Sequence, residues 1–246
     1  VNLCLNGQTI TGADNAAVIT VASNKSLNIT DCRETGTIRH AAEATGGCGI
    51  DVQGRLTLWN GTITGNPEKG VQVTGTFYMT GGSIAGNADR GVYVRTNGKF
   101  TMSDGTITGN AKGGVYVAAS SKFTMTGGSI TGNNTASGGA GVYVGASSTA
   151  AGTFIVSGKV QITDNWKNGT LENGRYVQGD SGARNNVFLS QKTVYPNNIV
   201  TYINIGSDGL SQDARIGVGR TSLPTTAGTG IKIATDAADT SLDYNT

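Results

Sequence analysis

A tyrosine recurs at the centre of three short apolar segments, and it is the side chain in this sequence best suited to contact a ligand. The segments read GVYV and contain Tyr93, Tyr116 and Tyr143. Two earlier segments of the same kind, GIDV and GVQV, have Asp51 and Gln72 at the central position. A row of aromatic rings can stack on sugar rings or form the hot spot of a protein-binding surface. The same row can instead be a cross-strand aromatic ladder that only stabilises a sheet.

Carboxylates are the second group of residues that could do chemistry. Two of them about 5–10 Å apart would be needed to hydrolyse a glycosidic bond. The column of residues that contains the tyrosines has a single carboxylate, Asp51. Asp104 and Asp164 occur in turns, where aspartate commonly bonds the local backbone. The sequence therefore predicts no catalytic residue and no enzyme, and a polysaccharide lyase or hydrolase is the competing interpretation.

A repeat of 21–23 residues must position all of these side chains. Asn87, Asn110 and Asn133 are 23 residues apart and end the related strings GGSIAGN, DGTITGN and GGSITGN. Each repeat has three short pieces in which apolar residues alternate with period two, as in β-strands, and turn residues separate the pieces. Stacked repeats of this kind predict an all-β solenoid, a right-handed parallel β-helix with three short strands per coil and roughly eight coils.

Alternation within each piece predicts which side chains point inward and stack from one coil to the next. Each of these side chains contributes roughly 1.5–3 kcal/mol when it is buried. A single coil cannot fold alone, because only stacking buries both of its faces. The predicted columns are Phe77, Phe100, Phe123 and Phe154; Met79, Met102, Met125 and Val156; and Ile63, Ile84, Ile107, Ile130 and Ile162.

A column of asparagines at one corner of the repeat is predicted to be structural. Stacked side-chain amides can bond the amides above and below and also satisfy turn backbone. The glycine that precedes most of these asparagines is expected to adopt a positive φ or to allow tight packing. The predicted ladder consists of Asn66, Asn87, Asn110, Asn133 and Asn165.

The cysteines do not have the spacing of a metal site. Cys4, Cys32 and Cys48 form no CxxC pair and are accompanied by a single histidine, His40, so we expect neither a metal nor another cofactor. Cys4 and Cys32 would lie on neighbouring coils, where a disulfide between them is geometrically feasible. The alternative is three small buried hydrophobic residues. His40 is expected in a turn or at the surface.

A second regular array, of outward threonines and a serine, offers a minor alternative. Parallel threonine columns on a flat β-helix face could order water, as they do in ice-binding proteins. Ser83 and Ala85 interrupt the array, and threonine is a common residue of exposed strands. The array consists of Thr62, Thr64, Thr106, Thr108, Ser129 and Thr131.

Composition counts against several classes of protein. The formal net charge is +2, only 14% of the residues are charged, and no block of lysine and arginine occurs. Binding to nucleic acid or to an anionic membrane surface is therefore not expected. No apolar run approaches the length of a membrane-spanning helix, so membrane insertion is not expected either.

Several strings resemble the adhesin-like β-helix repeat regions of large secreted surface proteins from Gram-positive bacteria, especially gut anaerobes. The resemblance covers nearly the whole chain and rests on LCLNGQTITG, VITVASNKSLNITDC, GTIRH, the GVYV, FTM and GGSITGN repeats, and NNVFL. It implies a non-catalytic stalk or adhesin that is secreted or attached to the cell wall, with a host glycan or a host surface protein as partner. A pure structural spacer is the remaining class.

The coils are expected to form a single domain over 1–246 with three regions. Residues 1–66 form degenerate N-terminal coils, residues 67–166 form the regular coils, and residues 167–246 form irregular C-terminal coils that cap the stack. The predicted C-terminal strands are NNVFL, IVTYINI, RIGV and GIKI. The chain begins inside an apolar strand-like run without a start methionine, so we expect it to be part of a longer polypeptide.

Overall fold

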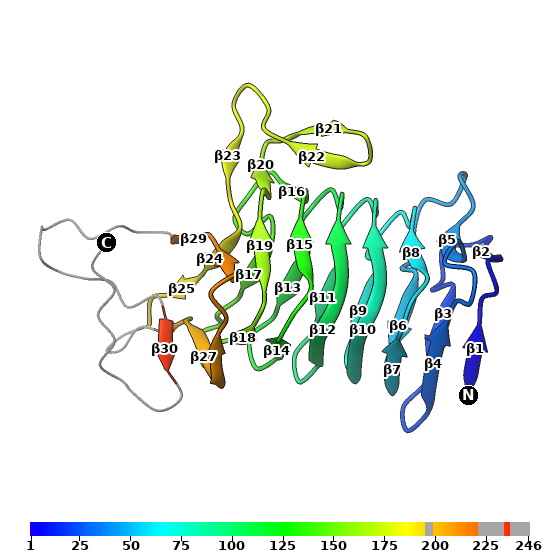
Figure 1. Cartoon of the computed structure of the whole chain (residues 1–246), viewed down its shortest axis with the longest axis horizontal. Coiled ribbons are helices and arrows are strands. Elements are labelled where there is room, and N and C mark those ends of the chain that lie inside the picture. Colours follow the sequence, from blue (N-terminus) through cyan, green and yellow to red (C-terminus); the bar gives the residue numbers. More distant parts are fainter. Residues whose placement is uncertain (195–198, 221–233, 237–246) are drawn as a thin grey trace, which may run out of the picture.

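The chain folds into a column of stacked β-strands, as the 21–23-residue repeat predicts (Figure 1). The computed structural model describes residues 1–194, 199–220 and 234–236, and every regular element within these ranges is a β-strand. Strands of successive coils pair in parallel, and the N-terminal strand lies at one end of the column. The parallel β-helix is therefore confirmed.

The first face of the column carries the phenylalanine and methionine columns on its inner side. Its strands pair in parallel from one coil to the next, with phenylalanine opposite phenylalanine. They are β1 (Asn2–Cys4), β4 (Ser26–Thr30), β7 (Arg55–Leu58), β10 (Thr76–Ala85), β12 (Lys99–Thr108), β14 (Lys122–Met125), β18 (Thr153–Gly158), β27 (Ile203–Leu210) and β30 (Ala234–Asp236).

The second face carries the isoleucine column and is joined to the first by two strands that continue around the corner. Strands β10 and β12 are each ten residues long and contribute to both faces, with register shifts after Met79. The expectation of three separate strands per coil is therefore modified in these two coils. The other strands of this face are β2 (Thr9–Gly12), β5 (Thr37–His40), β8 (Thr62–Thr64), β15 (Ser129–Thr131), β19 (Gln161–Thr163) and β28 (Arg215–Ile216).

The third face is an eight-stranded parallel sheet and carries the candidate site. Its short strands place valine, isoleucine or leucine inward and one central residue outward in the six strands from Ile50 to Leu189. The strands are β3 (Ile19–Val21), β6 (Ile50–Val52), β9 (Val71–Val73), β11 (Val92–Val94), β13 (Val115–Val117), β17 (Val142–Val144), β24 (Val187–Leu189) and β29 (Val218–Arg220).

The apolar columns meet in one continuous core. The rings of Phe77, Phe100, Phe123 and Phe154 are buried and stacked, with centroids 4.7 to 5.0 Å apart and planes within 5° to 8° of parallel. The isoleucine and methionine columns are likewise buried and paired in register. Identical side chains recur at identical positions, so each coil covers the apolar surface of the coil before it.

The asparagines form a continuous hydrogen-bonded ladder inside one corner. The Nδ2 atom of Asn87 donates to Oδ1 of Asn110 at 2.9 Å, and the backbone N–H of Asn87 donates to the same oxygen at 3.1 Å. This pattern repeats at every rung from Asn66 to Asn165. The glycine before Asn110 has φ +66°, the left-handed conformation in which glycine is not strained.

The ladder is longer than the sequence pattern suggested. Asn165 donates to Oδ1 of Asn186, which adds a rung after the irregular segment that begins at residue 166. At the other end, the ring of His40 lies against Asn66 and is only 2% exposed. The expectation that His40 lies in a turn or at the surface is wrong, because its side chain occupies the ladder position of an earlier coil.

The C-terminal part continues the column after an excursion. A hairpin projects from the body of the column, and the chain then returns to the third face at β24 (Figure 1). The short strands outside the three faces are β16 (Asn134–Thr135), β20 (Trp166–Lys167), β21 (Thr170–Glu172), β22 (Arg175–Val177), β23 (Ala183–Arg184), β25 (Gln191–Lys192) and β26 (Ile199–Val200). The expected strand GIKI lies outside the described residues.

Candidate functional site

The outward column of the third face is in register over six described coils. Tyr93, Tyr116 and Tyr143 lie opposite one another across strands β11, β13 and β17. Asp51 and Gln72 precede the tyrosines in this column, and Phe188, which the sequence pattern did not include, follows Tyr143. The valines on either side of each tyrosine are buried, so the backbone fixes the direction of each ring.

Asp51 and Gln72 bind each other instead of facing an open site. The Nε2 atom of Gln72 donates to Oδ1 of Asp51 at 3.2 Å, and Gln53 donates to the other carboxylate oxygen at 2.8 Å. Both acceptor oxygens of Asp51 are therefore occupied. The two residues share the tyrosine column, but neither lines the groove described below.

The aromatic residues stack on one another and do not form a flat strip of exposed ring faces. Tyr116 and Tyr143 have centroids 4.8 Å apart and planes 7° from parallel, and Phe188 continues the stack at 5.5 Å and 15°. Tyr93 meets Tyr116 edge-on at 69°. Since Tyr116, Tyr143 and Phe188 cover one another's faces, this part of the column presents ring edges and the tyrosine hydroxyl groups outward. Broad stacking of sugar rings on this column is therefore disfavoured.

Arg90 covers the end of the stack and was not identified from the sequence. Its guanidinium carbon lies 4.7 Å from the centroid of Tyr116 and 5.8 Å from that of Tyr93. Such cation–π contacts favour a fixed position for the charge. Nη1 of Arg90 also pairs with Asp89 at 3.1 Å. The signal in the sequence was the arginine that directly precedes GVYV.

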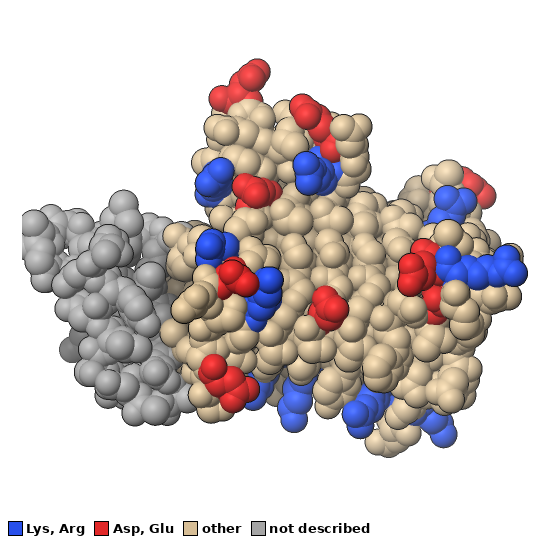
Figure 2. Space-filling view, in the orientation of Figure 1, with Lys and Arg blue, Asp and Glu red and all other residues tan. Residues whose placement is uncertain are grey.

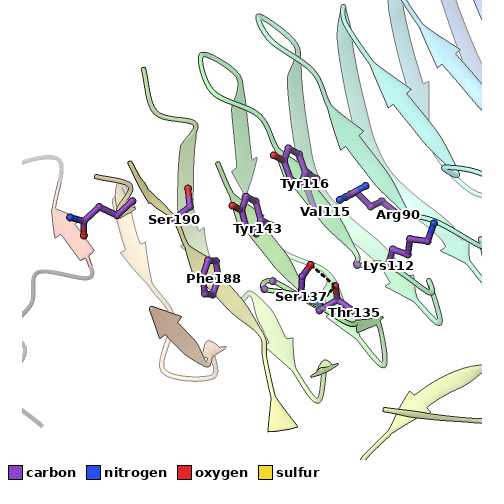
Figure 3. Close-up of a pocket in the computed structure, with 13 residues that line it drawn as sticks. Arg90, Lys112, Val115, Tyr116, Thr135, Ser137, Tyr143, Phe188 and Ser190 are labelled. Atoms are coloured by element: carbon purple, nitrogen blue, oxygen red, sulfur yellow. Dashed lines mark hydrogen bonds between the residues drawn. The ribbon is translucent and has the colours of Figure 1, made fainter. Parts of the chain in front are cut away.

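A groove of about 420 Å³ runs beside Tyr116, Tyr143 and Phe188 (Figure 3). Arg90 and Lys112 lie at the Tyr116 end, and Phe188 and Ser190 lie at the other end. Its lining contains two cations, several hydroxyl groups and no carboxylate. The other lining residues are Gly113, Val115, Thr135, Ser137, Gly138, Gly139 and Gln191.

The wall of the groove is a segment inserted after the Asn133 corner. The backbone N–H of Ser137 donates to Oγ1 of Thr135 at 3.2 Å, which closes a local turn. Gly138 lies so near Phe188 that a Cβ atom there would be 3.0 Å from the ring carbons. Oδ1 of Asn185 accepts the N–H of Gly139 at 2.7 Å. These contacts hold the wall against the stack, so the groove is built into the folded chain.

Ser190 supplies a buried hydroxyl group without a partner. The residue is 8% exposed, and its Oγ atom has no hydrogen bond within the described part of the chain. Its backbone carbonyl is satisfied by the N–H and the hydroxyl of Thr201. A buried polar atom without a hydrogen bond is costly, and a ligand that supplies the missing partner would remove this cost.

Tyr116 presents a neutral phenol to the groove. Burial, followed by repulsion from the neighbouring Tyr143 and Tyr93, raises its pKa above the ordinary value, although Arg90 acts in the opposite direction. The hydroxyl is therefore protonated at neutral pH and can both donate and accept a hydrogen bond. This suits a ligand that carries hydroxyl groups.

Other candidate positions lie away from the groove. Cys4 and Cys32 are free thiols whose Sγ atoms lie 2.9 Å apart at the surface, so the expected pair is adjacent but is not bridged in this structure. Cys48 is buried. In the described ranges, no cluster of three or more histidine, cysteine, aspartate or glutamate residues could hold a metal ion. None of the described elements is a helix long and apolar enough to cross a membrane.

Coils of parallel strands around one apolar core, with a groove on the outside, define the class of β-helix proteins. The chain belongs to the family described as right-handed β-helix region, whose model matches residues 17–246. The match agrees with the parallel pairing of all three faces and fixes the handedness of the column. Comparisons with curated proteins and with solved structures give no match.

Proposed function

We propose that this chain is a non-catalytic β-helical segment of a bacterial cell-surface protein that binds saccharides in the groove beside Tyr116, Tyr143 and Phe188. The observation that carries the proposal is the groove itself, with hydroxyl, amide and aromatic groups on a rigid frame. Binding sites for small ligands commonly combine a concave surface with a few fixed polar groups. The resemblance to adhesin-like surface proteins supports the location at the cell surface.

Hydroxyl groups are the ligand chemistry that this groove fits best. The phenols of Tyr116 and Tyr143, the exposed hydroxyl of Ser137 and the amide of Gln191 can each donate and accept hydrogen bonds. The edges of the stacked rings offer apolar contact for the carbon atoms of a sugar. A saccharide presents this mixture of hydroxyl groups and apolar edges.

The groups around the groove support binding without turnover. Glycoside hydrolysis generally uses two carboxyl groups on either side of the scissile bond. No carboxylate lines the groove, and Asp51, the carboxylate of the tyrosine column, is occupied by Gln72 and Gln53. A polysaccharide-degrading enzyme would therefore need a different surface of the molecule.

The groove gives one contact site per chain and not a repeated series. Phe188 and the inserted wall at residues 134–140 each occur once, although the tyrosine column itself repeats. Many weak contacts would then require many copies of the chain on one cell, where linkage raises the effective concentration. The rigid stacked coils would serve to hold the groove away from the cell wall.

The test is an array of glycans and extracellular host proteins screened with the purified chain. The double variant Tyr116→Phe/Tyr143→Phe keeps both rings and removes both hydroxyl groups, and we expect it to weaken glycan binding about tenfold or more. Tyr78→Phe is the matched control, because Tyr78 also lies beneath an arginine, Arg55, at 4.7 Å but on the first face.

Four results would overturn the proposal. Binding to proteins alone would identify a protein-binding surface, and turnover of a bound polysaccharide would identify an enzyme. Failure to bind anything on the array would favour a structural spacer. Binding that survives the loss of both hydroxyl groups would place the site outside the groove.

A further inference from the structure

The charges in the groove narrow the kind of saccharide that it can hold. Arg90 and Lys112 lie at the Tyr116 end of the groove, and no acidic side chain lines it (Figure 3). We infer that the groove selects an acidic saccharide, whose carboxylate or sulfate group is held between Arg90 and Lys112. This inference rests on the proposed function and adds the class of ligand.

Of the two cations that line the groove, Lys112 is the one without a partner among the described residues. Its side chain is exposed, and the described residues form no ion pair or hydrogen bond with its ammonium group. The four charged side chains in the equivalent turns of the two preceding coils, by contrast, neutralise each other. Lys69 pairs with Glu68 at 3.1 Å and with Asp89 at 3.6 Å, while Arg90 pairs with Asp89 at 3.1 Å. Lys112 therefore adds an uncompensated positive charge to this end of the groove.

Arg90 is held in place but retains donors for a ligand. Stacking on Tyr116 and one bond from Nη1 to Asp89 fix the plane of the guanidinium. Within the described structure, Nη2 and Nε of Arg90 have no hydrogen-bond partner. A planar guanidinium with free donors suits carboxylate and sulfate oxygens, and a fixed position reduces the entropy lost on binding.

The other end of the groove suits the uncharged part of the same ligand. Ser190 contributes a buried hydroxyl without a partner, and the neighbouring Gln191 contributes an exposed amide. A hydroxyl or acetamido group of the sugar could satisfy both. The groove thus has a cationic end and a neutral hydrogen-bonding end, which predicts one orientation for the ligand along the stack.

Paired probes that share one sugar chain and differ in the number of acidic groups test the inference. Oligogalacturonate is compared with its methyl ester, and chondroitin sulfate oligosaccharides are compared with unsulfated chondroitin; the two pairs separate carboxylate from sulfate recognition. Affinity for the full chain is measured by titration calorimetry at low and at physiological ionic strength. We expect the more acidic member of at least one pair to bind roughly tenfold more tightly, and this preference to weaken as salt is added.

Charge-removing variants locate the contact. Arg90→Gln/Lys112→Gln should abolish the preference for the acidic member of the pair, and Lys112→Gln alone should reduce it without touching the Tyr116 stack. Lys99→Gln/Lys122→Gln is the matched control, since it removes the same charge from exposed lysines at the start of β12 and β14 on the first face. A control of this kind is needed because lysine and arginine side chains also gather along the lower edge of the view in Figure 2, where they could attract an acidic ligand. Circular dichroism and thermal unfolding verify that each variant is folded.

The outcomes separate this inference from the proposed function. Equal binding of the more acidic and the less acidic member in both pairs, reduced by Tyr116→Phe/Tyr143→Phe, would overturn the acidic preference and leave saccharide binding in place. An acidic preference that disappears in the Lys99/Lys122 control would assign it to the first face and overturn the inference. No binding of either member of either pair, or of any glycan on the array, would overturn both.

Discussion

Nδ1 of His40 and Oδ1 of Asn66 lie 2.8 Å apart in the interior of the column. In later coils the same oxygen position accepts the amide of the preceding asparagine, so His40 replaces an asparagine as the first rung of the ladder. Its Nε2 atom lies 2.9 Å from the carbonyl oxygen of Ala16, in an earlier part of the chain. The single histidine therefore joins the ladder to the N-terminal coil.

Replacing this histidine should loosen the N-terminal coils. His40→Ala removes the ring that lies between Oδ1 of Asn66 and the carbonyl of Ala16 and leaves an acceptor without its donor, so we expect a loss of about 1–3 kcal/mol in the free energy of unfolding. Urea unfolding followed by circular dichroism measures it. Arg39→Ala is the control on the same strand, because Arg39 points outward and is exposed. Equal stability of the two variants would contradict a structural role for His40.

The amide of Asn110 tests the ladder in the regular coils. Asn110→Asp keeps the shape but replaces a donor that serves Ile84, Thr108 and Asn133 with a second acceptor. Buried acceptors would then face one another, so we expect a loss of at least about 3 kcal/mol at neutral pH. The same change at the exposed Asn168, whose positive φ aspartate tolerates, should cost little. Similar unfolding midpoints for the two variants would show that the ladder contributes nothing.

The repeat explains why the core and most of the ladder could be predicted. Stacked coils place residues of the same repeat position next to each other, so the period of the sequence predicts which residues contact one another. The phenylalanine column and the rungs from Asn66 to Asn165 follow directly from this. His40 was missed because a different residue type occupies the same position, and Asn186 was missed because the excursion before β24 interrupts the period.

The groove could not be predicted in the same way, because its walls come from segments outside the repeat. The bond from Gly139 to Asn185 joins residues 46 positions apart, and neither belongs to a recurring string. Phe188 and Ser190 lie in a coil whose sequence no longer resembles the others. The orientation of the rings was also beyond the pattern, since alternation gives the direction of a side chain but not the angle between neighbouring rings.

The adjacent thiols of Cys4 and Cys32 should differ in reactivity from Cys48. The hydrogen bond from the Cys32 side chain lowers the pKa of Cys4 to about 7, whereas burial raises the pKa of Cys48 to about 11. Because the thiolate is the nucleophile, alkylation of Cys4 should rise with pH through about 7, while Cys48 stays unmodified there. Mass spectrometry after timed iodoacetamide treatment measures both.

Removing one thiol provides the control for that profile. Cys32→Ala takes away the hydrogen bond, so the alkylation of Cys4 should shift to higher pH. In the unchanged protein, oxidised glutathione should accept two electrons from the pair and leave a Cys4–Cys32 disulfide, because the two sulfur atoms already lie in contact. A profile that is unchanged in the variant, or glutathione attached to both cysteines without a bridge, would refute this coupling.

Ser190 should show opposite effects on stability and on binding. Its buried hydroxyl has no partner in the described structure, so Ser190→Ala removes an unsatisfied group and should leave the free energy of unfolding unchanged or raise it by about 1 kcal/mol. Ser121→Ala is the matched control, because the buried Ser121 hydroxyl donates to the carbonyl of Ala118 at 2.7 Å and its loss should cost about 1 kcal/mol. If the groove holds a saccharide, Ser190→Ala should also weaken binding of the tightest array ligand about tenfold, while Ser121→Ala should not. A destabilised Ser190→Ala variant with unchanged affinity would mean that the hydroxyl serves the fold. A hydroxyl group kept for a ligand is unsatisfied in the free protein, so its removal should weaken binding without lowering the free energy of unfolding.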